Sequence, residues 1–255
     1  MIKNNICFYV FHTEENKKNS HRNVCNKNIY NSASNYFKQL DSSTFRIVDN
    51  EGIINFLKNN KKFLLDPNGW DPYHRPMLNS YKKERANPKG WKYGYIGVWA
   101  SNYYAWKNFL NTDHEYLLLF EDDVVLENNF FELMFDYLDF LPDDWDVFHQ
   151  YAPENLTNKT IKMLDGKYPI CKPYQSRSNA VYMLSRSGAE KAISEVESNP
   201  VFLPTDWFFF KQLKLFNMYT IAPGADMGCR VLDIRSSHSS DDFINISQII
   251  NDLSV

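Results

Sequence analysis

Residues 116–126, Tyr-Leu-Leu-Leu-Phe-Glu-Asp-Asp-Val-Val-Leu, decide how this chain is read. The first five are apolar or aromatic, with the length and composition of a strand buried on both faces. Three consecutive carboxylates follow: Glu121, Asp122 and Asp123. Because burying unpaired carboxylates is costly, a buried strand that ends in acids is typical of a functional sheet edge. The alternative is an acidic loop whose carboxylates are solvated or cap the next helix.

A divalent cation that carries a phosphorylated ligand is the usual occupant of such an edge in an α/β sheet. Hard carboxylate oxygens suit Mg²⁺ or Mn²⁺. Glu121 and Asp123 are two residues apart, so on an extended backbone they lie on one side and Asp122 lies on the other. We therefore predict Asp123 as a metal ligand, with Glu121 binding directly or through water.

The rest of the chain alternates strand-like apolar runs with segments of helical periodicity. This alternation predicts an α/β fold, with a mostly parallel sheet and helices on both faces. No Pro- or Gly-rich linker divides the chain, so we predict a single domain over 1–255, with long loops at 66–91 and 151–173. Strands are expected at 6–11, 44–48, 116–120, 145–149, 180–184 and 219–222, and helices at 29–40, 53–57, 94–110, 130–140, 185–197, 207–216 and 244–253.

Composition excludes several function classes. A net charge of −3 gives no electrostatic case for nucleic-acid binding. The four cysteines, which include no Cys-x-x-Cys pair, indicate neither a zinc site nor a redox motif. There is no signal-peptide pattern and no run of 18 uncharged apolar residues, so we expect a cytoplasmic protein without a membrane span. Peripheral contact with a membrane stays open.

Five segments, in order along the chain, resemble glycosyltransferase family 25, which includes lipopolysaccharide and collagen galactosyltransferases. Gly94–Ser101 resembles its Gly-any-Ile-Gly-any-any-any-Ser helix, and Phe120–Asp123 its Leu-Glu-Asp-Asp strand end. The other three are similar to a Trp-Asp-hydrophobic strand, a Tyr-hydrophobic-hydrophobic-Ser-any-any-Gly-Ala stretch and a Pro-hydrophobic-Asp segment. They are Trp145–Val147, Asn179–Ala189 and Pro204–Trp207.

This resemblance implies a Rossmann-like nucleotide-sugar transferase fold of the A type, with the donor-binding half roughly at 1–130 and the acceptor-side half at 131–255. It implies a metal-dependent, inverting transfer of a hexose, galactose or glucose, from a UDP-sugar to a hydroxyl of a lipopolysaccharide-like glycan. Mn²⁺ or Mg²⁺ would screen the leaving diphosphate. There are two alternatives. One is the same donor chemistry on a protein hydroxyl or a hydroxylated DNA base, and the other is a catalytically silent nucleotide-binding protein.

An inverting transferase needs a general base for the acceptor hydroxyl. Asp206 is our candidate, although it is also placed to cap the following helix. Asp146 is a weaker candidate, since a Trp-Asp pair on a strand is usually structural. His238 is a candidate third metal ligand, and Arg177 and Arg186 are candidate partners of the diphosphate.

The resemblance extends to the donor side. Asp122 is expected to contact ribose or sugar hydroxyls. Ser101 belongs to the donor-side helix motif, and Arg22 ends a basic turn that stands where the family has an Arg-rich donor loop. Asn102 occupies a position where the family usually has His. Trp207 is an acceptor-side candidate, and two weaker candidates, His149 and Gln150, lie at the end of the strand that begins at Trp145.

Overall fold

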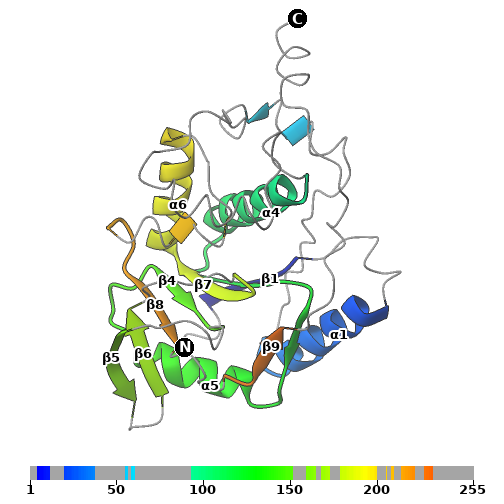
Figure 1. The fold of residues 1–255 in the computed structure, drawn as a ribbon, viewed down its shortest axis with the longest axis vertical. Coiled ribbons are helices and arrows are strands. Elements are labelled where there is room, and N and C mark those ends of the chain that lie inside the picture. The colour runs from blue at the N-terminus through cyan, green and yellow to red at the C-terminus, as the bar shows by residue number, and fades with distance from the viewer. Residues whose placement is uncertain are drawn as a thin grey trace, which may run out of the picture.

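The computed structural model describes residues 5–11, 20–37, 55–56, 59–60, 93–151, 159–164, 168–172, 179–199, 205, 208–209, 214–221 and 227–231. Within them, seven strands form one sheet in the order β1-β2-β7-β4-β8-β6-β5 (Figure 1). In that order the strands are β1 (Ile6–Val10), β2 (Tyr116–Phe120), β7 (Val181–Ser185), β4 (Val147–His149), β8 (Met218–Ile221), β6 (Tyr168–Lys172) and β5 (Lys159–Leu164).

Most strands of this sheet point the same way. The pairings give β1, β2, β4, β8 and β5 one direction, and β7 and β6 the opposite one. The predicted α/β fold with a mostly parallel sheet is therefore confirmed, and two antiparallel strands make the sheet mixed. The carboxyl ends of β1, β2, β4 and β8 meet at one edge, where β7 begins.

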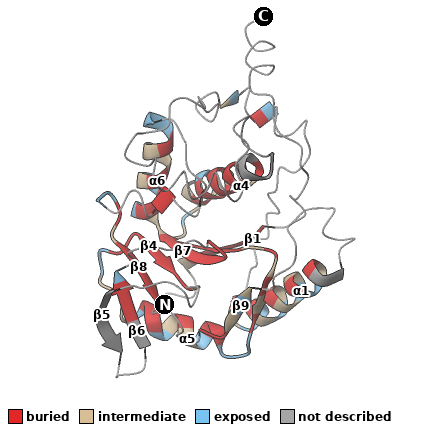
Figure 2. Cartoon of the chain, in the orientation of Figure 1, coloured by how far each residue is buried: buried red, intermediate tan, exposed pale blue. Residues whose placement is uncertain are grey.

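Helices cover both faces of the sheet (Figure 1). α4 (Tyr93–Leu110) and α6 (Arg186–Ser198) pack on one face, and α1 (Ser20–Ser34) and α5 (Phe130–Leu138) on the other. Side chains of β2 alternate between the two cores: Leu117 and Leu119 join the α4 side, Leu118 and Phe120 the α1 side. All four are fully buried, which stabilises the fold by about 1.5–3 kcal/mol for each side chain. The neighbouring strand β7 is also buried over most of its length (Figure 2).

Three helices agree with the sequence prediction. α4, α5 and α6 begin within one residue of the expected positions. Ser185, directly before α6, accepts a hydrogen bond from the Gly188 amide at 3.0 Å and caps the helix. That contact satisfies one of the free amides of the first helical turn.

α1 lies earlier in the sequence than the predicted helix at 29–40. It spans Ser20–Ser34, and the Tyr36 and Phe37 amides donate to the Ala33 carbonyl as the chain leaves it. Its fully buried residues include Cys25 and Ile29, four apart, and then Ala33. The polar residues around Cys25 conceal the first turns of this stripe in the sequence.

The predicted loop at 151–173 is wrong over much of its length, because β5 and β6 form an antiparallel hairpin there. Two prolines and a polar composition argued for a loop. Pro169 is tolerated because it pairs only with Met163 of β5, while contact with β8 begins at Ile170.

A small second sheet was not predicted. β3 (Val124–Leu126) pairs antiparallel with β9 (Cys229–Val231). Gly228, just before β9, has φ +65°, and a Cβ there would come within 2.7 Å of Asn129 Oδ1. This position therefore requires glycine.

Several predicted segments lie outside the described residues: the strand at 44–48, the loop at 66–91 and the helix at 244–253. Of the helices expected at 53–57 and 207–216, only a few residues are described. Asn55, Phe56, Phe208 and Phe209 are helical, but residues 214–216 are not, because a turn forms at Lys214 and Leu215.

Candidate active site

The three carboxylates form a turn directly after β2, which we call the acidic turn (Glu121–Asp123). The Glu121 amide donates to the Ala180 carbonyl at 2.8 Å, so the first residue of this turn is fixed against the start of β7. On the other side, the Phe11 amide donates to the Phe120 carbonyl at 2.9 Å. The acidic turn thus lies at the carboxyl edge of the sheet, where ligands of α/β proteins bind.

The acids of this turn differ in exposure. Asp122 is only 3% exposed, whereas Glu121 and Asp123 are half-buried. The backbone forms a turn rather than the extended strand we assumed. Even so, the middle carboxylate is separated from its two neighbours by its environment.

Arg22 of α1 forms an ion pair with Asp122, and Arg22 is likewise only 3% exposed. The structure therefore brings together two residues that the sequence placed at the donor site. Each supplies the opposite charge that burial of the other requires.

A second contact joins α1 to the segment after the acidic turn. The Asn28 side chain accepts from the Leu126 amide at 2.7 Å and donates to the Leu126 carbonyl at 3.0 Å. Arg22 and Asn28 thus hold residues 122–126 from one helix, and we call this pair of contacts the α1 clamp. Sequence reasoning missed Asn28, because an asparagine in an Asn-rich helix carries no distinguishing signal.

Cys25 lies between these two contacts along α1. Burial raises the pKa of its thiol, and the negative charges of Asp123 and Asp122 raise it further. The group next to the acidic turn is therefore a neutral thiol at physiological pH, so it adds no competing negative charge.

Within the described ranges, no group of three or more His, Cys, Asp or Glu side chains could by itself hold a metal ion. Two half-buried carboxylates nevertheless fit Mg²⁺ or Mn²⁺, which commonly use one or two protein carboxylates together with substrate phosphates. His238 and Asp206 lie outside the described residues, so their roles stay predictions.

The Ser101 hydroxyl donates to the Gly97 carbonyl at 2.8 Å inside α4, where the side chain is buried. Its neighbour Asn102 accepts a hydrogen bond from the Tyr182 hydroxyl, which in turn accepts from Trp106 Nε1 at 3.0 Å. Burial raises the pKa of Tyr182 well above its ordinary value. The phenol therefore stays protonated and links α4 to β7, and this is the contact that Asn102 makes in this chain.

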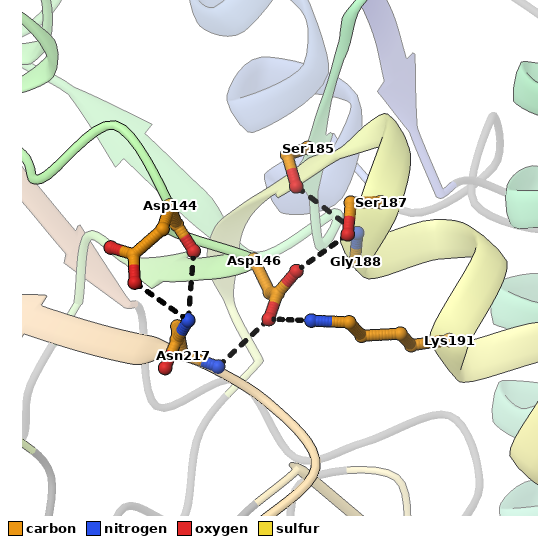
Figure 3. A network of polar contacts seen from close by, with 7 residues as sticks. All are labelled: Asp144, Asp146, Ser185, Ser187, Gly188, Lys191 and Asn217. Atoms are coloured by element: carbon orange, nitrogen blue, oxygen red, sulfur yellow. Dashed lines mark hydrogen bonds and ion pairs between the residues drawn. The ribbon is translucent and has the colours of Figure 1, made fainter.

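Asp146 directly precedes β4, at the opposite end of that strand from the acidic turn, and Figure 3 shows its polar contacts. It is 1% exposed, and it accepts from Lys191 Nζ at 2.6 Å, Ser187 Oγ at 3.0 Å and the Asn217 amide at 2.8 Å. A Cβ on Gly188 would lie 2.2 Å from the Asp146 carbonyl oxygen, so α6 approaches this residue closely. Asp146 therefore joins β4, α6 and β8. These contacts favour a structural role for Asp146 over a role as general base.

Arg186 is also occupied by structural contacts. Its guanidinium donates to three backbone carbonyls in the segment that leaves α4: Nη1 to Leu110 at 3.2 Å, Nε to His114 at 3.1 Å, and Nη2 to Thr112. These bonds satisfy carbonyls at a helix end, so Arg186 is not available to a diphosphate. Arg177 and Trp207 lie outside the described residues.

Comparison with known protein families identifies the class of protein to which this chain belongs. The model of glycosyltransferase family 25, described as an LPS biosynthesis protein family, matches residues 3–209. The chain belongs to glycosyltransferase family 25. The matched range includes β1, the α1 clamp, the acidic turn and Asp206, but ends before His238. Family 25 membership supports a glycosyltransferase activity for this chain.

Among solved structures, similarity is remote. A glycosyltransferase involved in glycosylation of the major capsid of PBCV-1 is 10% identical with a TM-score of 0.42, and the alignment covers 98% of each chain. A197 from STIV is 19% identical with a TM-score of 0.32, over 49% of this chain and 64% of that one. A 4-diphosphocytidyl-2C-methyl-D-erythritol synthase from Anaerococcus prevotii DSM 20548 is 7% identical, with a TM-score of 0.41 over 99% and 100%.

No curated protein matches this family 25 chain by sequence. In the part of the chain that the structure describes, no helix is long and apolar enough to cross a membrane.

Proposed function

We propose that this family 25 chain transfers a hexose, galactose or glucose, from a UDP-sugar to a hydroxyl of a lipopolysaccharide-like glycan, with inversion at the anomeric carbon. One observation carries the proposal. In a chain of this family, two half-buried carboxylates stand at the carboxyl end of β2, where the α1 clamp holds their turn.

Glu121 and Asp123 are the residues that would hold Mn²⁺ or Mg²⁺ together with the donor diphosphate. When bound, the cation supplies Lewis-acid stabilisation of the charge that develops on the leaving nucleoside diphosphate. His238 as a third ligand and Arg177 as a diphosphate partner extend this site on sequence grounds.

The proton of the acceptor hydroxyl goes to Asp206 in this proposal. A carboxylate serves as general base when it can reach the attacking hydroxyl within hydrogen-bond distance. Asp146 does not compete for this role, because Lys191, Ser187 and the Asn217 amide already occupy its oxygens.

The α1 clamp has a mechanistic consequence. Catalysis by electrostatic stabilisation depends on groups that are already in position when charge develops. The Arg22–Asp122 ion pair and the Asn28–Leu126 contacts fix both sides of Asp123. The metal-binding carboxylates would therefore need little rearrangement when the donor binds.

We place the reaction in the cytoplasm, with a lipid-linked glycan reached by peripheral contact with a membrane. The alternative acceptors are a protein hydroxyl and a hydroxylated DNA base. Incubation with each class of acceptor, followed by analysis of the glycosylated product, distinguishes them from a glycan acceptor. A nucleotide-binding protein without activity would bind the donor but release no UDP.

A thermal-shift screen tests the donor site. We measure the Tm of wild type, Asp123→Ala and a control, Asp136→Ala. Asp136 is an exposed acid of α5. Each protein is melted with UDP, UDP-galactose, UDP-glucose, GDP and CMP sugars, with Mn²⁺ and with chelator. We expect a rise in Tm with UDP-sugars that requires Mn²⁺, persists in Asp136→Ala and disappears in Asp123→Ala. Equal shifts in all three proteins, or no shift with any nucleotide, would remove the proposed donor site.

A further inference from the structure

Two buried amide side chains at the carboxyl edge of the sheet form no hydrogen bond with any described residue. Gln150, directly after β4, is fully buried, and Asn179, two residues before β7, is 3% exposed. Both polar atoms of each amide lack a hydrogen-bond partner. Leaving a buried polar group unsatisfied costs about 1–3 kcal/mol, so two such amides at one edge call for a ligand or an ordered water.

The backbone brings these amides to the same place as the acidic turn. The Gln150 amide N–H donates to the Val181 carbonyl at 3.0 Å, which continues the β4–β7 ladder by one residue. On the other edge of β7, the Ala180 carbonyl accepts from the Glu121 amide. The carboxylates that would hold the donor diphosphate follow β2, so Asn179 lies one strand away from them and the end of β4 lies two strands away.

Strand alternation places Gln150 on the α1 side of the sheet. Phe148, two residues earlier, belongs to the core on that side, as does Val181. Arg22 reaches Asp122 from the same side. The Gln150 amide and the α1 clamp therefore flank the edge from one face.

We propose that Gln150 and Asn179 bind hydroxyl groups of the transferred hexose, an inference that rests on the proposed function. A primary amide offers two donors and an acceptor, which matches hydroxyls that both donate and accept. The hexose and the ribose are each bonded directly to the diphosphate, so both lie next to it, and comparison of UDP with UDP-hexose separates a contact to the hexose from a contact to the ribose. Burial of the two amides suits a step from which water must be excluded, because water would otherwise take the sugar.

Thr220 provides a matched comparison. It is fully buried on β8, and its hydroxyl also lacks a hydrogen-bond partner among the described residues. However, it lies inside the strand, opposite His149, and so on the other face from Gln150. Thr220→Val removes a buried unsatisfied group without touching the proposed sugar contact.

Calorimetric titration with UDP and with UDP-hexose, in Mn²⁺, tests the inference on wild type, Gln150→Met, Asn179→Leu and Thr220→Val. We expect each amide variant to bind UDP-hexose about tenfold or more weakly, as loss of a hydrogen bond to a buried group predicts, and UDP itself within about twofold. Thr220→Val should bind both ligands as wild type does. Equal loss of UDP and UDP-hexose, or no loss, overturns the inference.

Wild-type protein alone supplies a second test that needs no variant to fold. A donor that lacks the recognised hydroxyl leaves an amide unpaired, so at least one deoxy-hexose analogue should bind markedly more weakly than its parent. If all analogues bind equally, the amides do not contact the sugar.

Ligand-free stability separates a sugar subsite from a buried structural water. Amides that await a sugar lose no partner on substitution, so Gln150→Met and Asn179→Leu should melt at or above the wild-type Tm. A lower Tm in both, with unchanged UDP-hexose binding, assigns the amides to a structural water and overturns the inference. Wild type that binds no UDP-sugar overturns the donor proposal itself, whereas loss confined to the sugar contact leaves that proposal standing.

Discussion

Arg22 and Asp122 form an ion pair in which both residues are only 3% exposed, and this pair ties helix α1 to the acidic turn. Two charges removed from water stabilise a fold only while both are present. The pair therefore makes the position of the carboxylates proposed to bind the metal depend on a helix some hundred residues earlier in the sequence.

Removing one partner of this pair should be far worse than removing both. We expect Arg22→Met to lower the free energy of unfolding by about 3–5 kcal/mol, because Asp122 would remain buried and uncompensated. The double variant Arg22→Met with Asp122→Leu should recover much of that loss. Urea denaturation of the single and double variants measures the coupling, and simple additivity of the two losses would contradict it.

The second contact of the α1 clamp can be tested on its own. Asn28→Ala removes two hydrogen bonds to Leu126 and should lower the free energy of unfolding by about 1–3 kcal/mol. It should also weaken Mn²⁺-dependent UDP binding, since Asp123 loses a support. Ser34→Ala, at the exposed end of the same helix, is the control and should change stability by less than about 0.5 kcal/mol. If Asn28→Ala has a lower free energy of unfolding but binds UDP as wild type does, the clamp has only a structural role.

Asp146 and Asp144 are two residues apart but have opposite roles. Asp146→Asn breaks contacts of a buried carboxylate with Lys191 and Ser187, so we expect a loss of about 1.5–3 kcal/mol. Asp144 is exposed, and its side chain accepts a hydrogen bond from the Asn217 side chain. Asp144→Asn should therefore change the free energy of unfolding by less than about 0.5 kcal/mol.

Urea denaturation measures these losses, and thermal shift with UDP and Mn²⁺ supplies the second readout. Folded Asp146→Asn should still bind UDP. Loss of UDP binding in a stable Asp146→Asn protein would place this residue at the donor site after all.

Alkaline pH should weaken the fold through Tyr182. Burial raises the pKa of this phenol above its ordinary value of 10.0. The folded chain thus holds the proton more tightly than the unfolded one, and the resulting stability is complete below pH 10 and is lost as pH rises above it. We expect Tm to fall above pH 10 in wild type and to fall less steeply in Tyr182→Phe. Parallel Tm–pH curves for the two proteins would show that Tyr182 contributes nothing to this loss.

Local sequence signals determined the strand at 116–120, the helix caps and the class of fold. A run such as Leu117–Phe120 can only be a buried segment, and its length restricts it to a strand. Ser185 followed by a helical pattern determines where α6 begins. The acids after the strand identified the site because their cost when buried is a property of the residues themselves.

Tertiary structure alone decided which polar residues support the site and which support the fold. Spacing in the sequence separates Asp122 from Asp123, but nothing local pairs Asp122 with Arg22 or distinguishes Asp146 from a catalytic acid. β6 pairs with β8 and β9 pairs with β3, and both partners are distant in sequence, so the local composition of these segments misleads. Likewise, the buried amides of Gln150 and Asn179 become informative only once their surroundings are known, because a missing hydrogen-bond partner is a property of packing and not of sequence.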